Sequence, residues 1–100
     1  MTRIRFEWDD AKNLGNRRKH GVSFEEASQV FLDPLYFSVY ERIEDGEERW
    51  QTFGYVVGLV LMVAHSIREE GVGDLVEVIR IITAREATAR ERRRYEDENG

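Results

Sequence analysis

The chain lacks cysteine altogether, and this absence excludes disulfide bonds, thiolate nucleophiles and cysteine-ligated zinc. Long apolar runs are missing as well. The longest, residues 55–64, contains Gly58 and is about half as long as a membrane-spanning helix must be. No apolar segment typical of a secretion signal follows Met1. We therefore expect a cytoplasmic protein that makes no contact with a membrane.

Histidine is almost as scarce. The two histidines, His20 and His65, lie far apart in the sequence, and neither has a second ligand at metal-binding spacing. The carboxylates form no diagnostic pair. A glycine-rich phosphate loop and a Gly-x-Ser-x-Gly nucleophile motif are also missing. The sequence therefore predicts neither a metal site nor a cofactor.

Charge is plentiful, and it is unevenly distributed along a chain whose net charge is -5. Residues 1–20 carry six Lys or Arg against three acidic residues, whereas residues 21–60 carry two against eight. Residues 79–95 carry six arginines against two acidic residues. A chain with this pattern can present one positive face although it is acidic overall, and its acidic middle segment suits a basic partner.

Apolar periodicity and capping residues predict the secondary structure. Alternation predicts a strand over residues 3–8, followed by a helix from an Asp9 cap to a Gly21 stop. A capping box, Ser23 with Glu26, opens a second helix, which Asp33-Pro34 ends. The remaining strands are expected over residues 36–44, 48–57, 59–68 and 75–82, and a last helix from a capping box at residues 83–86 to about residue 96.

Four consecutive strands without crossover helices form a mainly antiparallel sheet. The order β-α-α-β-β-β-β-α therefore predicts an α+β fold in which two N-terminal helices and one C-terminal helix pack on the sheet. We expect one domain over residues 1–96 and a frayed tail over residues 97–100.

The first helix ends in four consecutive basic side chains, Arg17-Arg18-Lys19-His20, directly before Gly21. Cations at this end complement the negative pole of the helix dipole, and glycine adopts the left-handed conformation that ends a helix. The same residues could also present a charged edge to an anion. Both interpretations stay open at the level of the sequence.

Arginine, histidine, lysine and tyrosine are the side chains left for catalysis, and they suit phosphodiesters. Cleavage of RNA through its own 2′-OH needs a base, an acid and cations that stabilise the developing phosphorane. Histidine transfers protons near neutral pH, arginine holds phosphate oxygens with a planar fork, and tyrosine can orient a phosphate or stack on a base. Any protein of this size contains such residues, so composition alone does not select this chemistry.

A series of motifs resembles the BrnT family of toxins over nearly the whole chain. They are Phe6-Glu7-Trp8-Asp9, Lys12, Asn16, residues 19–27 (KHGVSFEEA), residues 30–34 (VFLDP), Glu48-Arg49, Gly54, residues 63–68 (VAHSIR), residues 79–85 (IRIITAR), Ala87-Thr88 and residues 91–95 (ERRRY). The resemblance implies the toxin half of a bacterial type II toxin–antitoxin system, with a fold similar to that of RelE-like ribonucleases. The sequence departs from the family between Arg68 and Glu77, which is longer and more acidic than usual, so the edge of an RNA cleft there is in question.

The resemblance also implies a partner. BrnA, the antitoxin of such systems, is a ribbon-helix-helix protein that binds DNA and neutralises the toxin. We therefore expect a two-plus-two assembly with a BrnA-like antitoxin, an RNA substrate, and contact with operator DNA only through the antitoxin.

The candidate catalytic residues are His20, Arg49, His65, Arg68, Arg80 and Arg85, and the candidate RNA-binding residues are Lys19, Arg92 and Tyr95. Arg80 lies in an apolar strand, where an unpaired arginine is costly. The resemblance places it on the active-site strand, and the alternative is an ion pair with Glu47, Glu48 or Glu77. Arg85 is expected in the first turn of the last helix, where the dipole disfavours a cation and a phosphate would explain it.

The other candidates have structural alternatives too. Arg49 and Arg68 can form surface ion pairs or contact substrate, and His65 can be a hydrogen-bonded core residue or a catalytic one. Arg92 belongs to a run of arginines that fits a solvated helix end as well as a contact with RNA or antitoxin. For His20, the helix-end role is already filled by its neighbours, and the resemblance favours a role in the site.

Two functions remain open. The first is a metal-independent endoribonuclease toxin that cleaves mRNA and inhibits translation and growth. The second is a non-catalytic module that binds a DNA-binding antitoxin and modulates its operator binding. The enzyme requires the arginines and His20 to converge on one cleft. The binding module would leave them dispersed in ion pairs, with a sizeable apolar patch exposed elsewhere.

Overall fold

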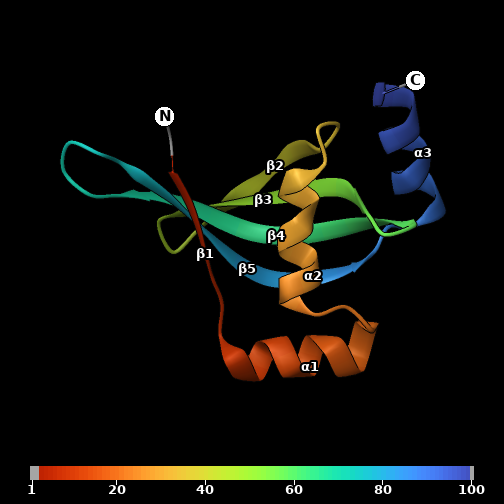
Figure 1. The fold of residues 1–100 in the computed structure, drawn as a ribbon, viewed down its shortest axis with the longest axis horizontal. Helices are drawn as coiled ribbons and strands as arrows, with labels where there is room; N and C mark the ends of the chain where they lie inside the picture. Colours follow the sequence, from red (N-terminus) through yellow and green to blue (C-terminus); the bar gives the residue numbers. More distant parts are fainter. Residues whose placement is uncertain (1–2, 100) are drawn as a thin grey trace.

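The computed structural model describes residues 3–99, which form five strands, three α-helices and one 3-10 helix (Figure 1). In chain order they are β1 (Arg3–Glu7), α1 (Asp10–His20), α2 (Phe24–Ser28), the 3-10 helix η1 (Gln29–Leu32), β2 (Phe37–Glu44), β3 (Glu47–Val56), β4 (Leu59–Glu70), β5 (Val76–Glu86) and α3 (Ala89–Asn99).

The strands form one sheet in the order β1-β5-β4-β3-β2. β1 pairs in parallel with β5, and the other three neighbouring pairs are antiparallel. The predicted α+β fold and its order of elements are therefore confirmed. Across residues 3–99, no helix has the length and apolar character that a membrane crossing requires.

α1 begins and ends where the sequence predicts. The Asp9 side chain accepts a hydrogen bond from the backbone N–H of Lys12, and Gly21 has a left-handed φ of 74°. The four basic side chains before Gly21 occupy the last turn of the helix. Their positive charge therefore lies beside the negative pole of the helix dipole, as expected for a helix C-terminus.

The second predicted helix is divided in two. Ser23 and Glu26 form the expected capping box, but the α-helix ends at Ser28 and continues as the 3-10 helix η1. Asp33 follows η1 and accepts hydrogen bonds from the backbone N–H groups of Leu35 and Tyr55. These contacts join the turn after η1 to β3.

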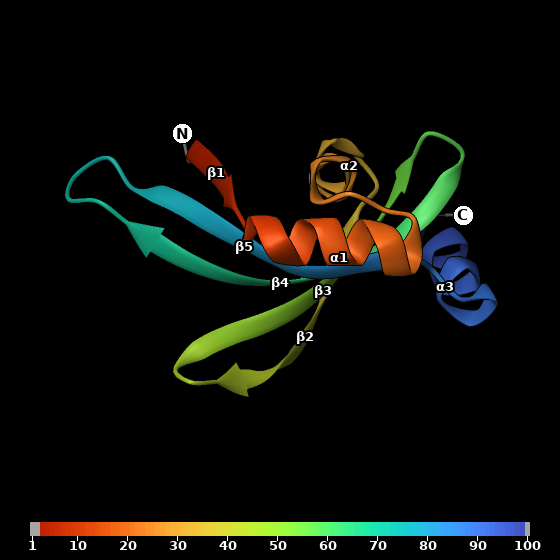
Figure 2. The same ribbon diagram turned by 90° about the horizontal axis from the view of Figure 1, so that it is seen from below.

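Tight turns join the strands predicted over residues 36–44, 48–57 and 59–68, and a further hairpin is longer than its predicted strands. Asp45-Gly46 connects β2 to β3, and Val57-Gly58 connects β3 to β4. β4 and β5 continue to a pairing between Glu70 and Val76. The acidic segment after Arg68 is therefore the end of a long hairpin that projects from the sheet (Figure 2).

The predicted start of the last helix is wrong. Residues 83–86 belong to β5, where Ala84 is fully buried and pairs with Val63 of β4. The capping box lies five residues later, because Thr88 and Glu91 exchange the two hydrogen bonds of this motif. Two Thr-Ala-Arg-Glu tetrapeptides compete for the role, and burial against β4 keeps the first of them in the sheet.

The last helix also continues further than predicted. The sequence predicts its end near Glu96, but α3 runs through Asn99. Fraying of the tail over residues 97–100 stays a prediction. Gly100 lies outside the described residues. The assignment of a single domain to residues 1–96 stays a prediction.

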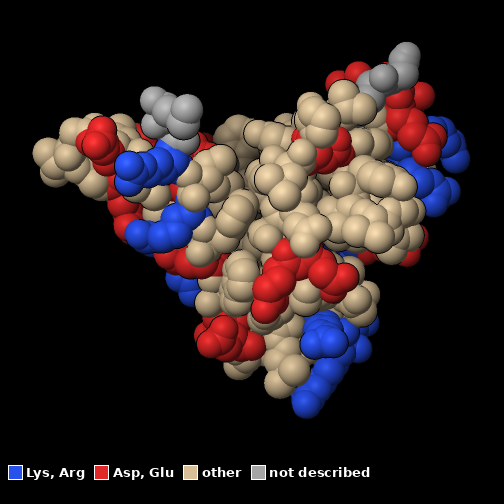
Figure 3. Space-filling view, viewed as in Figure 1, with Lys and Arg blue, Asp and Glu red and all other residues tan. Residues whose placement is uncertain are grey.

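The sheet separates two apolar cores. α1, α2 and η1 lie on one face, called here the α2 face, against residues such as Val63, Ile79 and Ile81. This face is turned toward the viewer in Figures 1 and 3. On the opposite face, the α3 face, Tyr95 of α3 packs near Phe53 and other apolar residues at one end of the sheet. The other end of the α3 face is occupied by polar side chains.

Candidate functional site

A row of polar side chains crosses the α3 face. Glu7 of β1 pairs with Arg80 of β5, Arg80 with Ser66 of β4, Ser66 with Arg49 of β3, and Arg49 with Arg42 of β2. Directly paired residues of neighbouring strands point to the same side of a sheet. All five side chains therefore lie on one face, and they are called the arginine row below.

Arg49 and Arg80 are weakly held by carboxylates. The Arg80 side chain is 46% exposed, and its Nη1 lies 3.8 Å from Oε2 of Glu7. The Arg49 side chain is 23% exposed, and its Nη1 lies 3.9 Å from Oε2 of Glu44. Both distances exceed hydrogen-bond length. Within residues 3–99, these two guanidinium groups therefore keep their N–H donors for another acceptor.

Ser66 lies between the two arginines and is almost fully buried. Its Oγ and the Nε of Arg49 are buried and have no hydrogen-bond partner among the described residues. A buried polar group without a partner costs about 1–3 kcal/mol. An acceptor that reaches this point would relieve that cost, so the middle of the row favours an anion.

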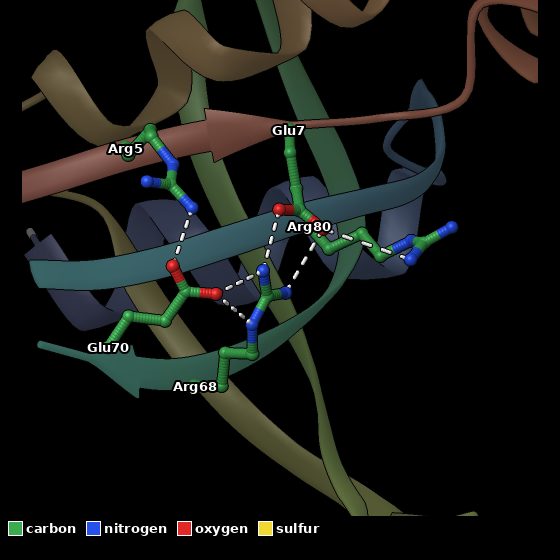
Figure 4. A network of polar contacts seen from close by, with 5 residues as sticks. All are labelled: Arg5, Glu7, Arg68, Glu70 and Arg80. Carbon is green, nitrogen blue, oxygen red and sulfur yellow. Dashed lines mark hydrogen bonds and ion pairs between the residues drawn. The ribbon is translucent and has the colours of Figure 1, made fainter.

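Arg68 lies two residues after Ser66 on β4, and all three nitrogens of its guanidinium group donate hydrogen bonds to carboxylates (Figure 4). Its Nη1 and Nη2 donate to the two oxygens of Glu7 at 3.0 and 2.7 Å. Its Nε and Nη2 donate to Oε2 of Glu70 at 2.9 and 2.7 Å, and Arg5 donates to the other oxygen of Glu70 at 2.7 Å. The geometry therefore gives Arg68 a positioning role: it holds Glu7, which in turn lies beside Arg80.

The charge of Glu7 follows from this network. Hydrogen bonds from Arg68 hold the pKa of Glu7 below its usual range, and the positive charges of Arg68 and Arg80 act in the same direction against partial burial. Glu7 is therefore ionised at neutral pH. A carboxylate at this place orients Arg80 without occupying its donors at hydrogen-bond distance.

The chemistry open to the row is the recognition of phosphate. Guanidinium groups bind two phosphate oxygens at once through parallel N–H donors and keep their charge at every physiological pH. Arg49 and Arg80 flank one residue, so that both can approach the same phosphate group. Such an arrangement also stabilises negative charge that develops on phosphorus during cleavage.

The structure corrects the placement of Arg85. It lies in β5 beside Met62 and not in the first turn of the last helix, so the argument from the helix dipole does not apply. Its Nη1 and Nη2 donate to the two oxygens of Glu91 at 2.7 and 3.1 Å. Arg85 therefore ties β5 to α3, and its carboxylate partner competes with any phosphate.

His65 lies on the α2 face and is fully buried. Its Nε2 is 2.6 Å from Oγ1 of Thr52, and its ring contacts Phe31 edge-on at a centroid distance of 5.2 Å. Burial lowers the pKa of His65 to about 4, so the ring is neutral at pH 7. This is the geometry of a hydrogen-bonded core histidine, the structural alternative for this residue.

His20 and Lys19 are exposed at the C-terminal end of α1, and within residues 3–99 neither side chain makes a hydrogen bond or an ion pair. Asn16, one helical turn earlier, donates to the carbonyl oxygen of Ala84. Ala84 is four residues, or about 13 Å, beyond Arg80 along β5. Because α1 runs in the same direction as β5 in Figure 1, the structure does not bring His20 to the arginine row.

Arg92 and Tyr95 lie on α3. Arg92 is exposed, and its Nε lies 3.9 Å from Oε1 of Glu96. The Tyr95 ring is buried against Phe37, and its hydroxyl donates to Oδ2 of Asp33. Burial and this bond raise the pKa of Tyr95 to about 12. Tyr95 therefore anchors α3, whereas Arg92 is open to a partner.

Sequence reasoning did not single out Ser66 and Glu7 as site residues. Alternation along β4 puts Ser66 on the same face as Arg68, and alternation along β1 puts Glu7 on the same face as Arg5. That signal was present in the sequence. It became informative only with the register between strands, which places both residues beside Arg80.

Metal ligands are not clustered in the part of the chain that the structure describes. Within residues 3–99, no group of three or more His, Cys, Asp or Glu side chains is placed to hold an ion.

Comparison with known proteins identifies one family. A family model described as the ribonuclease toxin BrnT of type II toxin–antitoxin systems matches residues 8–91. The matched range contains Arg49, Ser66 and Arg80, and it begins one residue after Glu7. No curated protein matched the chain.

Proposed function

The chain belongs to the BrnT family of ribonuclease toxins, and from this premise we propose that it cleaves RNA on the α3 face of its sheet. Arg49 and Arg80 hold the scissile phosphate across Ser66. Glu7 and Arg68 keep Arg80 in place.

One observation carries this proposal. Arg49 and Arg80 come from two different strands, flank Ser66 in register, and have no carboxylate at hydrogen-bond distance within the described residues. Structural arginines normally saturate their donors with carboxylates or carbonyls, as Arg68 and Arg85 do here. Two unsaturated arginines around one buried hydroxyl favour a phosphate.

The proposed reaction is attack of the RNA 2′-oxygen on the adjacent phosphorus, with departure of the 5′-oxygen of the next nucleotide; water takes the proton of the 2′-hydroxyl, and the departing 5′-oxygen receives a proton from water. Negative charge grows on the non-bridging oxygens as the phosphorane forms. The two guanidinium groups stabilise that charge in place of a metal ion. Cleavage of mRNA in the cytoplasm would then stop translation and growth.

We also propose that the topology is RelE-like. The order of elements and the mainly antiparallel sheet, with the candidate site on the face away from α1 and α2, support this assignment. The fold implied by the sequence motifs and the observed architecture are then the same.

The test of the catalytic proposal is RNA cleavage by the purified protein. We expect RNA to be degraded at the same rate with and without EDTA, because the positive charge at the phosphate comes from arginine. Products should carry 2′,3′-cyclic phosphate and 5′-hydroxyl ends, detectable by end-labelling. Loss of activity in EDTA that a divalent ion restores would refute the metal-independent reaction.

A type II toxin–antitoxin family implies an antitoxin partner. We propose that this partner is a BrnA-like ribbon-helix-helix protein, that the assembly contains two toxin and two antitoxin chains, and that operator DNA is contacted through the antitoxin alone. Co-expression with the adjacent reading frame and light scattering of the purified complex would measure the stoichiometry. A mass equal to one toxin and one antitoxin chain would contradict it.

A non-catalytic binding module is the second candidate function. It is favoured by the engagement of Arg68 and Arg85 in ion pairs and by the exposed apolar side chains on the α2 face. In that case an Arg80→Ala variant would keep every measurable activity of the protein.

A further inference from the structure

The end of the α2 face that the helices leave open carries apolar and acidic side chains. We propose that it is the docking surface for a basic, amphipathic segment of the antitoxin. The docking surface consists of Tyr40, Ile43, Glu48, Trp50, Ile67 and Glu69. This inference rests on the antitoxin partnership proposed above and is independent of whether the protein cleaves RNA.

Strand register brings these residues together. Tyr40 pairs with Trp50, which pairs with His65, and His65 belongs to the α2 face. One row further, Ile43 pairs with Glu48, and Glu48 with Ile67. Glu69 follows two residues after Ile67 on β4 and therefore points to the same side.

The apolar part of the surface is unusually open for a sheet face. Ile43 is 65% exposed and Tyr40 is 46% exposed, and the Tyr40 and Trp50 rings meet edge-on at 5.3 Å. A cavity of about 400 Å³ lies beside them, lined by Glu48, Trp50, Ile67, Arg68 and Glu69. The guanidinium of Arg68 is bound to Glu7 and Glu70 on the α3 face. The hollow therefore offers apolar walls with carboxylates on its rim.

The charge of the two faces is opposite at this end of the sheet. Glu77 pairs with Glu69 and with Ile4, so a third carboxylate joins Glu48 and Glu69 on the α2 face. None of the residues that the register places in these rows of the α2 face is Lys or Arg. The arginines of the same strands lie on the α3 face. In Figure 3, uncharged surface lies between β1 and α2, and basic groups lie at the left of the view beside β1.

This chemistry selects the occupant. Carboxylates repel the RNA backbone, so the docking surface does not extend the nucleic-acid site. A second copy of this chain would bring glutamates against glutamates. A segment with Lys or Arg beside apolar side chains fits both the apolar walls and the acidic rim. Its apolar side chains fill the hollow, and its cations pair with the carboxylates of the rim. The antitoxin is the partner that the family implies, and we assign this segment to it.

The test uses two lysine substitutions in the docking surface, Ile43→Lys and Glu69→Lys. Each places a cation against the expected cations of the antitoxin. We expect the dissociation constant for the antitoxin from the adjacent reading frame to rise at least about tenfold in each variant, measured by titration calorimetry. RNA cleavage should be unchanged in both, because the arginine row is on the other face.

Leu32→Lys is the matched control, since Leu32 is 81% exposed on η1, outside the docking surface. It should bind the antitoxin like the wild type, and so should Arg49→Ala. Thermal melting of all four variants checks their fold. Wild-type affinity in both Ile43→Lys and Glu69→Lys, or a loss of affinity in Leu32→Lys alone, would overturn the proposal. Failure of every form to cleave RNA would refute the catalytic proposal and leave the docking result intact.

Discussion

Arg80→Ala should lower the rate of RNA cleavage at least about a hundredfold and abolish toxicity on induced expression. Removal of one group that stabilises developing charge commonly costs two to three orders of magnitude in rate. The fold should be retained, because the Arg80 side chain is 46% exposed and its ion pair with Glu7 spans 3.8 Å. Growth arrest, cleavage of labelled RNA and thermal melting, measured together, separate the catalytic effect from a loss of stability.

The companion variants make this prediction specific. Arg80→Lys should restore activity only in part, since lysine keeps the charge but cannot donate two parallel hydrogen bonds to phosphate. Arg49→Ala should resemble Arg80→Ala, because both arginines flank Ser66.

The matched controls lie on α1. Arg18→Ala removes an exposed arginine far from the row, and His20→Ala removes the helix-end histidine. Both should keep toxicity, and His20→Ala should cost a few tenths to about 1 kcal/mol of stability as a helix-end cation. Full toxicity of Arg80→Ala and Arg49→Ala would move the active site elsewhere. Loss of toxicity in His20→Ala with an unchanged melting temperature would bring His20 back into the site.

Acidification from pH 7 to pH 4.5 should lower the free energy of unfolding by roughly 2–3 kcal/mol through His65 alone. Burial lowers the pKa of His65 from 6.5 to about 4 in the folded protein. The unfolded chain therefore binds a proton as the pH falls through 6.5, while the folded protein stays unprotonated until about pH 4. The full stability of the fold with neutral His65 is therefore present above pH 6.5, and part of it is lost as the pH falls from 6.5 to about 4.

Substitution of His65 isolates the effect. His65→Gln should be less stable at pH 7, because it loses the contact with Phe31 and changes the bond to Thr52, but its stability should vary less between pH 7 and pH 4.5. Leu32→Ala, which removes an exposed side chain with no titratable group, is the control and should keep the wild-type dependence. Urea unfolding at each pH gives the free energies. The same steepness in His65→Gln as in the wild type would show that another group titrates.

Acidic side chains contribute most of their own loss of stability below this window. Hydrogen bonds lower the pKa values of Glu7, Glu70 and Glu91 from 4.5, led by those from Arg68 to the first two and from Arg85 to Glu91. A carboxylate whose pKa is lower in the folded protein than in the unfolded chain stabilises the fold when the pH is above its pKa in the unfolded chain. That stability is lost as the pH falls below about 4.5. These groups therefore destabilise the fold at more acidic pH than His65 does.

The sequence by itself determined most of the local structure and the family. Caps act within a few residues, so Asp9, Gly21 and the Ser23–Glu26 box mark helix ends correctly without knowledge of the fold. Asp45-Gly46 likewise carries its turn in its own backbone preference. The family motifs cover nearly the whole chain and indicate the BrnT family before any contact is known, and the family model matches residues 8–91.

Competition between equal local signals was decided by packing. Residues 83–86 and 88–91 have the same Thr-Ala-Arg-Glu sequence, and either could cap a helix. Only the tertiary structure reveals that Ala84 is buried beside Val63, which keeps the first copy in β5. Because the first copy stays in β5, Arg85 lies in a strand and not in the first turn of a helix, and the helix-dipole argument for a phosphate contact no longer applies.

The site was decided by tertiary structure for the same reason. Arg68 and Arg80 both lie in strands, and the acidic residues after Arg68 already favour an ion pair with Glu70, but nothing along the chain reveals the role of Glu7. Glu7, which is distant in sequence, saturates Arg68 at 2.7 Å but lies 3.8 Å from Arg80. Alternation along a strand determines on which face of the sheet a side chain lies. The register between strands determines which side chains it contacts there. Those contacts distinguish an arginine that stabilises the fold from one that is free to bind a phosphate.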